Sequence, residues 1–306
     1  MNVVVAGEAL VDLILRPDGS IAAIPGGGPF NAARTLARLG IGTVFLGGIS
    51  ADRFGQQLRS RLEDDGVHLG MPEPSALPTT LALAELDAGG AASYRFYFEG
   101  TAAPEVSPAD AHAAATADMQ ILHVGTLGLV FEPMATTMEG LVADLGDAVL
   151  LFVDPNCRPL TIRDRDAYIA RLHRVLRRAD VVKVSGDDLD YLSPGSDRLA
   201  AARALLELGP SVVLFTDGAE AVHVLTAAGE ESVPVPSVDV VDTVGAGDSF
   251  GGGFLATWVD AGRTRSDLHD LAALRAAAER AVVVAGITCT RAGAEPPTLA
   301  ELAEPA

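Results

Sequence analysis

The sequence predicts an α/β protein in which helices cover both faces of a mostly parallel central sheet. Three observations support this fold class. Short β-branched runs alternate with longer amphipathic segments through most of the chain, which is typical of repeated strand–helix units. Glycine-rich turns follow several of the predicted strands. The length of 306 residues is enough for one large domain, and we expect residues 1–306 to form it.

The first hundred residues combine strands, helices and a hairpin. We predict strands over residues 3–6, 11–15, 21–24, 43–47, 79–86 and 92–98, and helices over residues 30–39 and 54–64. The last two strands flank Asp87-Ala88-Gly89-Gly90, a turn sequence typical of β-hairpins. Because these arms interrupt the α/β rhythm, we expect residues 12–25 and 79–100 to form a small β lid on the main domain.

From residue 121 the alternation of strands and helices is regular. We predict strands over residues 121–124, 149–153, 181–184, 212–215 and 222–225, and helices over residues 133–145, 166–178, 197–208, 250–261 and 268–285. Repeated units of this kind favour parallel strands with helices on both faces of the sheet, which gives three layers.

Composition narrows the choice of partners and compartment. The net charge of −19 disfavours nucleic acid and anionic membrane as the main partner. The two cysteines, Cys157 and Cys289, are too few for a disulfide framework, so we expect reduced thiols and a cytoplasmic location. We see neither a signal peptide at the N-terminus nor an apolar run long enough to cross a bilayer.

Residues 241–250, with the sequence V-D-T-V-G-A-G-D-S-F, are the most informative segment. They follow a β-branched run and lead into a helix-compatible stretch. Glycines relax the limits on φ, so the amides of Gly245, Ala246 and Gly247 can point at one anion. Asp248 beside them could accept a proton from an attacking hydroxyl. The alternative is a strand–turn–helix junction with an aspartate near the N-cap.

Two common nucleotide-binding loops are absent. Lys183 is the only lysine in the chain, and no G-x-x-x-x-G-K-[ST] loop surrounds it. The segment from Gly245 reads G-A-G-D-S-F-G and misses the dinucleotide fingerprint G-x-G-x-x-G. A nicotinamide-dependent dehydrogenase is therefore disfavoured.

A second polar constellation lies near the N-terminus. The segment P-G-G-G-P-F-N, residues 25–31, opens a predicted helix, and its glycines permit close approach of a ligand to the backbone. Asn31 and Asp12 could bind hydroxyl groups, although a local cap and a solvated turn carboxylate explain them equally well. Asp12, the glycine loop, Asn156 and Asp248 all follow predicted strands, so we expect them to converge on one rim of the sheet.

These residues carry a family resemblance that runs nearly end to end. The chain resembles the ribokinase-like carbohydrate kinases, also called the phosphofructokinase-B family. The matching segments are G-G-G-P-F-N-A-A at residues 26–33, L-A-R-L-G at 36–40, G-G-I-S-A-D-R-F-G at 47–55 and D-T-V-G-A-G-D at 242–248. The resemblance implies an ATP-dependent sugar kinase in which the β lid also forms a homodimer interface.

The resemblance also implies roles for individual residues. Asp248 would be the catalytic base, and Gly245, Ala246 and Gly247 would form the anion hole. The sugar would be held by Asp12, Gly27, Gly28 and Asn31. The segment D-P-N-C-R at residues 154–158 resembles the D-P-N-x-R of fructokinase-like members, in which Arg158 would neutralise phosphate charge. The alternative is that Asn156 and Arg158 only shape the exit of a strand.

The resemblance also implies which residues bind the nucleotide and its ions. Lys183, Thr216 and Gly218 would lie on the nucleotide side. The segment S-G-D-D at residues 185–188 stands where the family has the magnesium motif N-x-x-E, so Asp188 would order water on Mg²⁺. Asp242 and Val244 would bind a monovalent cation such as K⁺. For Asp188 and Asp242, structural carboxylates at a helix start and in a turn are the alternatives.

Fructokinases are the most similar members, so the expected substrate is fructose. A 2-keto-3-deoxygluconate kinase is the nearest alternative: Arg95 could meet a substrate carboxylate, but Glu99 would repel it. A nucleoside kinase is a further alternative. A protein of another class, which binds sugar or nucleotide without catalysis on the same fold, also stays open.

Overall fold

The computed structural model describes residues 2–86, 92–116 and 118–303. Its main sheet has nine strands in the order β13-β12-β11-β10-β9-β8-β1-β4-β5. Neighbouring strands from β5 to β11 run parallel, whereas β12 and β13 are antiparallel additions at one edge. The strands are β1 (Asn2–Ala6), β4 (Gly42–Leu46), β5 (His68–Leu69), β8 (Met119–Gly125), β9 (Leu150–Asp154), β10 (Val181–Ser185), β11 (Val212–Thr216), β12 (Val222–Thr226) and β13 (Gly229–Val233).

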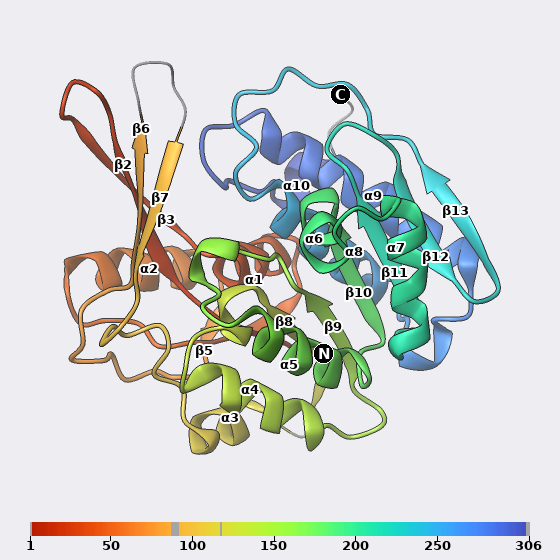
Figure 1. Ribbon diagram of the computed structural model, residues 1–306, viewed down its shortest axis with the longest axis horizontal. Coiled ribbons are helices and arrows are strands. Elements are labelled where there is room, and N and C mark those ends of the chain that lie inside the picture. The colour runs from red at the N-terminus through yellow and green to blue at the C-terminus, as the bar shows by residue number, and fades with distance from the viewer. Residues whose placement is uncertain (1, 87–91, 117, 304–306) are drawn as a thin grey trace.

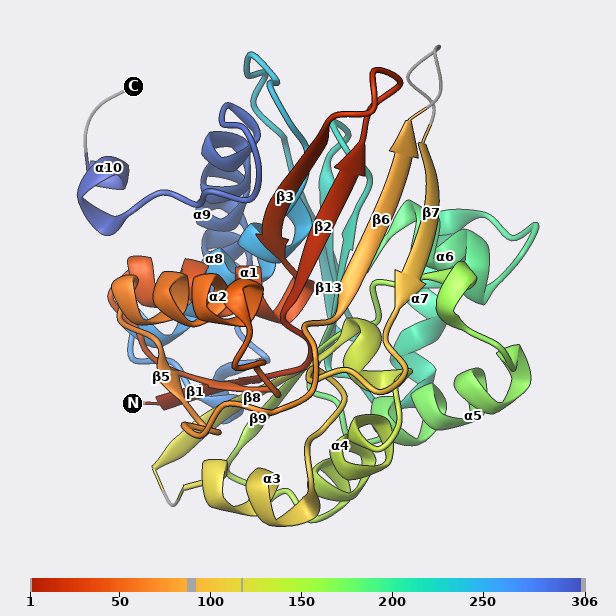
Figure 2. The ribbon, with the colours of Figure 1, turned by 90° about the vertical axis from the view of Figure 1, so that its left-hand side faces the viewer.

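Helices cover both faces of this sheet, as Figure 2 shows. Successive residues of a strand face opposite sides, so Val3 and Val5 pack on one helical layer and Val4 and Ala6 on the other. The first layer holds α1 (Gly28–Arg38), α2 (Arg53–Asp64), α8 (Ala246–Asp260) and α9 (Leu271–Cys289). The second holds α3 (Pro108–Ala114), α4 (Met134–Ala143), α5 (Arg165–Leu176), α6 (Gly186–Leu192) and α7 (Arg198–Ala204). The predicted three-layer α/β fold is confirmed.

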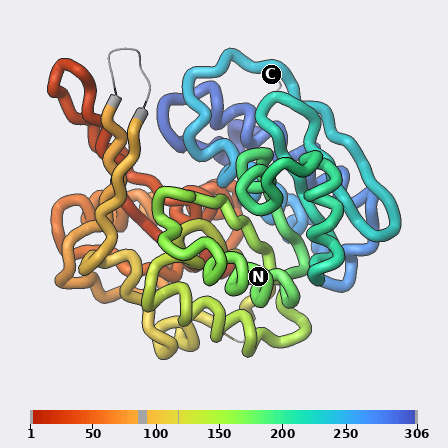
Figure 3. The backbone as a smooth tube through the Cα atoms, viewed as in Figure 1, coloured from red at the N-terminus to blue at the C-terminus, as the bar shows by residue number. Residues whose placement is uncertain are grey.

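A second sheet of four strands stands apart from the main sheet (Figure 1). Its order is β3 (Ile21–Gly26), β2 (Leu10–Leu15), β6 (Leu81–Leu86) and β7 (Ala92–Tyr97). The chain enters it twice, as a red hairpin and then as an orange one (Figure 3). β2 and β6 pair in parallel, which joins the two hairpins into one sheet. The predicted turn at residues 87–90 lies outside the described residues.

The structure corrects the start of one predicted helix. Helix α8 begins at Ala246, not at residue 250, because Gly245 adopts φ 76° and turns the chain into the helix earlier. The β-branched run before it was expected to be a strand, but residues 234–241 are irregular, and Val240 and Val241 are exposed. No strand of the described chain pairs with them. Asp248 therefore lies inside the first helical turn and does not follow a strand.

Several shorter elements have no counterpart in the sequence predictions. Helix α3 and helix α6 each begin with a capping box, at Ser107 and Ser185 respectively. Each of these helices has only seven residues, too short for a clear hydrophobic period. Strand β13 and the two-residue strand β5 were missed for the same reason. Within the described residues, no helix is both long and apolar enough to span a bilayer.

Candidate active site

The carboxyl ends of the parallel strands bring polar residues to one edge of the main sheet. Glu8 follows β1, Thr126 follows β8, and Asn156 follows β9. Helices α1 and α8, which hold Asn31 and Asp248, begin beside this edge. Ligands of open α/β sheets bind at the carboxyl ends of strands, so this is the place where the fold itself favours a site.

A hydrogen bond joins the first turns of α1 and α8. Asn31 Nδ2 donates to Asp248 Oδ2 over 2.8 Å. Among the described residues Asn31 Oδ1 is buried without a hydrogen-bond partner, so it is available to a ligand hydroxyl. Burial raises the pKa of Asp248, and the Asn31 hydrogen bond together with the charges of Lys183 and Arg158 opposes that rise. The carboxyl group therefore has a higher proton affinity than an ordinary aspartate.

The start of α8 has the open geometry of an anion site. Ala246 N donates to the carbonyl of Thr243 over 3.2 Å, whereas the amides of Gly247 and Asp248 have no acceptor among the described residues. Unpaired amides at a helix N-terminus attract anions through their partial positive charge. Close packing and a positive φ require glycine at Gly245, whereas Gly247 lies close only to the end of the Lys183 side chain. A Cβ at Gly245 would lie 2.4 Å from Ala294 Cβ, and one at Gly247 would lie 2.9 Å from Lys183 Nζ.

Gly28, the first residue of α1, lies at the centre of the cluster. A Cβ there would lie 2.7 Å from Thr126 Oγ1, 3.2 Å from Asp248 Oδ1 and 3.3 Å from Asn156 Nδ2. Gly28 N donates to Glu8 Oε1 over 3.1 Å, which ties the glycine loop to the end of β1. Three polar side chains thus converge on the backbone at Gly28, so closely that even a methyl group at this position would be crowded.

Asp12 reaches the same region from the second sheet. It comes after β1 and lies within β2, the strand predicted over residues 11–15, where it pairs with Ile24 of β3. A Cβ at Gly26 would lie 2.6 Å from Asp12 Oδ2, so the carboxyl group lies against the glycine loop. Burial raises the pKa of Asp12 to about 6. The positive charge of Arg158 lowers this pKa, whereas the negative charge of Asp248 raises it.

Glu8 is a third carboxyl group in this region and is almost completely buried. Burial raises its pKa to about 8, so Glu8 is largely protonated at neutral pH. Its Oε2 atom has no hydrogen-bond partner. The positive charge of Arg158 lowers the pKa of Glu8, Asp12 and Asp248 alike. The pocket is therefore rich in carboxyl groups, with one guanidinium at its edge.

A buried ion pair lies behind the start of α8. Lys183 Nζ lies 3.0 Å from Asp154 Oδ2, and both side chains are nearly inaccessible. Burial lowers the pKa of Lys183, but Asp154 and Asp188 outweigh this effect and hold it above its ordinary value. Burial raises the pKa of Asp154 to about 6, and its Oδ1 atom has no partner. The Lys183 ammonium group thus lies directly beside Gly247 at the start of α8.

Asp188 caps helix α6 and connects two loops. Its Oδ1 accepts from Cys157 N over 2.6 Å, and its Oδ2 accepts from Ser185 N and Ser185 Oγ, each over 2.7 Å. The described residues contain no cluster of three or more side chains that could hold a metal ion alone. Mg²⁺ is commonly held by one or two carboxylates together with substrate phosphates, and the unpartnered Asp154 Oδ1 fits that role.

The remaining predicted residues lie next to this cluster. Asp242 Oδ1 accepts from Val244 N over 3.0 Å and its Oδ2 from Gly293 N over 2.9 Å, so its carboxylate fixes the turn before α8. Thr216 pairs with Ser185 in the sheet, and Gly218 follows it with φ 58°. Among the described residues, no hydrogen bond joins Thr216 or Gly218 to the group around Asp248.

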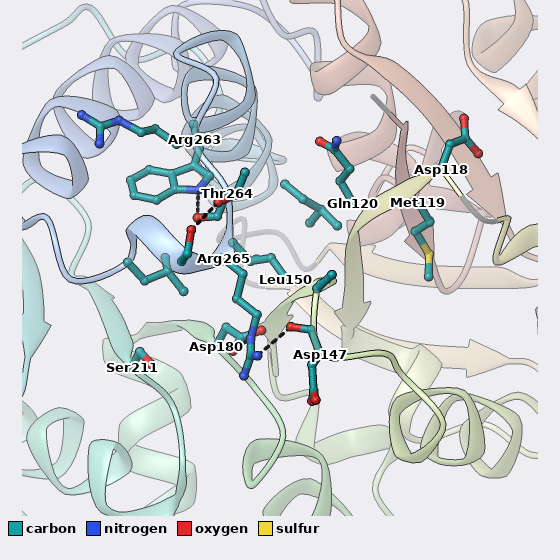
Figure 4. Close-up of a pocket in the computed structure, with 15 residues that line it drawn as sticks. Asp118, Met119, Gln120, Asp147, Leu150, Asp180, Ser211, Arg263, Thr264 and Arg265 are labelled. Atoms are coloured by element: carbon teal, nitrogen blue, oxygen red, sulfur yellow. Dashed lines mark hydrogen bonds and ion pairs between the residues drawn. The ribbon is translucent and has the colours of Figure 1, made fainter.

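A pocket of about 770 Å³ lies at the opposite edge of the sheet, where β8, β9, β10 and β11 begin (Figure 4). Its buried acid, Asp180, accepts hydrogen bonds from Leu151 N, Arg178 and Arg265. Arg265 also donates to the carbonyl of Asp147. The negative charge of Asp180 is thus matched by two guanidinium groups and a backbone amide, so this carboxylate ties together the segments at this edge of the sheet.

Three residues of the cluster were not singled out from the sequence. Glu8 could have been found, since it is a carboxylate directly after a predicted strand. Asp154 belongs to the D-P-N-C-R segment, but its pairing with Lys183 required the sheet register. Thr126 had no sequence signal, because its position depends on backbone angles.

Comparison with known proteins assigns the molecule to a class. Residues 1–301 match the pfkB family carbohydrate kinase model. A fructokinase from Rhizobium leguminosarum bv. trifolii is 37% identical over 255 residues, which are 82% of this chain and 78% of that protein. The structure of aminoimidazole riboside kinase from Salmonella enterica, complexed with aminoimidazole riboside and an ATP analogue, matches with a TM-score of 0.86, 29% identity and coverage of 99% and 98%.

A fructokinase from Vibrio cholerae O395, solved with fructose, ADP and calcium ion, matches with a TM-score of 0.85 and 26% identity over 98% of this chain and 97% of that one. The fold is therefore ribokinase-like, and the protein is a phosphotransferase that acts on a sugar hydroxyl. The chain belongs to the pfkB family of carbohydrate kinases.

Proposed function

We propose that this sugar kinase transfers the γ-phosphate of ATP to a hydroxyl of fructose, with Asp248 as the base. The observation that carries the proposal is the Asn31–Asp248 hydrogen bond at the start of α8, next to unpaired helix amides. A proton acceptor and an anion site thereby lie side by side. Their combination is what attack of a hydroxyl on a phosphate requires.

The chemical step follows from this arrangement. The sugar oxygen forms a bond to the γ-phosphorus while the bond between that phosphorus and the ADP oxygen breaks. The hydroxyl proton passes to Asp248, and the leaving ADP takes the electron pair of the broken bond. The amides of Gly247 and Asp248, free within the described chain and in the turn that Gly245 and Ala246 open, stabilise the charge on the transferred phosphoryl group, whereas the Ala246 amide already donates to the Thr243 carbonyl. Positioning and charge stabilisation carry most of the catalysis, because the transition state of phosphoryl transfer is loose.

The sugar contacts are Asp12, Gly27, Gly28, Asn31 and Arg158. Asp12 and Asn31 Oδ1 accept hydrogen bonds from sugar hydroxyls, while the glycines admit the ring close to the backbone. Glu8 is largely protonated at neutral pH, but the carboxyl groups of Asp12 and Asp248 still outnumber the one guanidinium nearby, that of Arg158. That balance favours a neutral sugar over an acid such as 2-keto-3-deoxygluconate.

The nucleotide lies on the side of β10 and β11 in this proposal, with Lys183, Thr216 and Gly218 as its neighbours. Mg²⁺ would neutralise phosphate charge, held by phosphate oxygens with Asp154 and water ordered by Asp188. A monovalent cation such as K⁺ would lie at Asp242 and the Val244 carbonyl. The solved relatives support bound nucleotide and metal ions, since one was determined with ADP and calcium ion.

We further propose that residues 1–306 act as a single domain with the four-stranded sheet as its lid. The lid would close over the sugar through Asp12. Its outer surface, which includes the half-exposed ring of Tyr97 on the face opposite to the packed Phe96, would form a homodimer interface.

A sugar-panel assay tests the proposal. ATP turnover is measured with fructose, 2-keto-3-deoxygluconate, ribose and aminoimidazole riboside, the last because a similar structure contains it. We expect turnover with fructose at the highest kcat/KM. A higher kcat/KM with 2-keto-3-deoxygluconate or with the riboside would show that this compound, and not fructose, is the substrate. Binding of fructose without turnover of any panel member would favour a non-catalytic protein.

A further inference from the structure

Two non-glycine residues of the described chain have positive φ, and both border the active site. They are Thr126, with φ 52°, and Asn156, with φ 39°. Asparagine tolerates this region, whereas a β-branched residue is rarely found there because its side chain crowds the backbone. Strain of this kind persists when the surrounding structure over-determines it, and it gathers at functional sites.

The backbone around Thr126 is fixed on both sides. A Cβ at Gly125 would lie 1.8 Å from the carbonyl oxygen of Asp154, so β8 and β9 touch at this point. On the other side, Leu127 and Leu129 are buried in the short 3₁₀ helix that starts at Thr126. These contacts hold the Thr126 side chain next to Gly28, where a Cβ would lie 2.7 Å from Thr126 Oγ1.

The Thr126 hydroxyl differs from those of the other buried threonines in its bonding. Six buried threonines of the described chain donate their hydroxyl to a backbone carbonyl, namely Thr35, Thr43, Thr101, Thr137, Thr161 and Thr288. Thr126 is only 6% exposed, yet within the described chain its hydroxyl forms no hydrogen bond. The Thr126 Oγ1 atom is nevertheless not fully enclosed, so a ligand hydroxyl can reach it and supply the hydrogen bond that the described chain does not.

We propose that Thr126 is a sugar-binding residue whose hydroxyl recognises a substrate hydroxyl next to the one that Asp248 deprotonates. The inference rests on the proposed function and adds a specificity residue to it. Asn156 Nδ2 and Asp248 Oδ1 face the same space over Gly28. A polyol that enters this space meets a base, an amide donor and a hydroxyl at once, which discriminates between sugars by the placement of adjacent hydroxyls.

Three substitutions separate binding from packing. Thr126→Val keeps the branched shape and removes the hydroxyl, so we expect the fructose KM to rise roughly tenfold or more, with the ATP KM unchanged. Thr126→Ser keeps the hydroxyl and should restore a KM close to that of the wild type. Thr126→Gly relieves the positive φ, so its Tm should equal or exceed that of the wild type while its fructose KM rises.

Thr137→Val is the matched control. The Thr137 hydroxyl donates to the Val106 carbonyl, so removal of this hydroxyl should lower Tm without changing the fructose KM. Fructose binding is also measured by calorimetry without ATP. Wild-type turnover with an unchanged fructose KM and Kd in Thr126→Val would overturn this inference alone. Fructose binding by the wild type without turnover would overturn the proposed function, and the binding constants of the variants would then decide the role of Thr126.

Discussion

Asn31 and Asp248 lie 217 positions apart in the chain, and their side chains are joined by a 2.8 Å hydrogen bond. The bond holds the Asp248 carboxyl group at the start of α8 and favours its charged form. It therefore couples the proton affinity of the proposed base to the residue that would bind the sugar.

Asn31→Ala should move the acid limb of kcat/KM for the sugar to higher pH. Burial already raises the pKa of Asp248, and loss of the hydrogen bond removes an interaction that opposes this rise. Since the base must be ionised to accept a proton, activity would be lost at a higher pH than in the wild type. The pH profile measures the effect; an acid limb at the wild-type position would show that the bond does not tune the base.

Asp248→Asn should reduce kcat by roughly a thousandfold, since a positioned base contributes about 10²–10⁴-fold. Sugar binding should be nearly unchanged, because the amide retains the size of the carboxyl group. Asp166→Asn, which alters an exposed acid in the first turn of α5, controls for the general loss of charge at a helix start. A kcat close to normal in Asp248→Asn would exclude Asp248 as the base.

Asp12→Ala should raise the sugar KM by about a hundredfold, on the order of 3 kcal/mol for hydrogen bonds to a charged group. Its carboxyl group lies against Gly26 in β2, on the side of the glycine loop. Asp18→Ala removes an exposed carboxylate from the turn between β2 and β3 and should leave the KM unchanged. Equal KM values for both variants would remove Asp12 from the sugar site.

Glu8→Gln should change how stability depends on pH. Burial raises the pKa of Glu8 from 4.5 to about 8, so the folded protein holds a proton that the unfolded chain releases. The free energy of unfolding contributed by Glu8 is complete below pH 4.5 and is lost as pH rises toward 8. Glutamine resembles the protonated acid but does not titrate, so the variant does not lose this part of its free energy of unfolding as pH rises.

The variant should therefore gain stability relative to the wild type from pH 5 to pH 8, by on the order of 3 kcal/mol. Denaturant unfolding at several pH values measures this difference. Glu73→Gln, which removes an exposed carboxylate, is the control. A constant difference across the pH range would show that Glu8 is ionised in the folded protein.

The predicted fold followed from local patterns because its strands are continuous β-branched runs and its long helices have clear periods. Residues 43–47 and 212–215, for example, match β4 and β11 closely. The start of α8 could not be placed, since Gly245 decides it through a backbone angle and a close contact with Ala294. Helices α3 and α6, each of seven residues, were not predicted because neither is long enough to show a clear hydrophobic period.

The sequence by itself determined the fold class and the segments that supply the site. Glycines, carboxylates and amides after strands mark these segments, because backbone freedom and side-chain chemistry are local properties. Only the tertiary structure decided how the residues combine: that Asn31 bonds Asp248, that Lys183 pairs with Asp154 behind Gly247, and that Thr126 is held with an unpaired hydroxyl. Such contacts depend on sheet register, burial and helix position, which arise from packing between residues far apart in the chain.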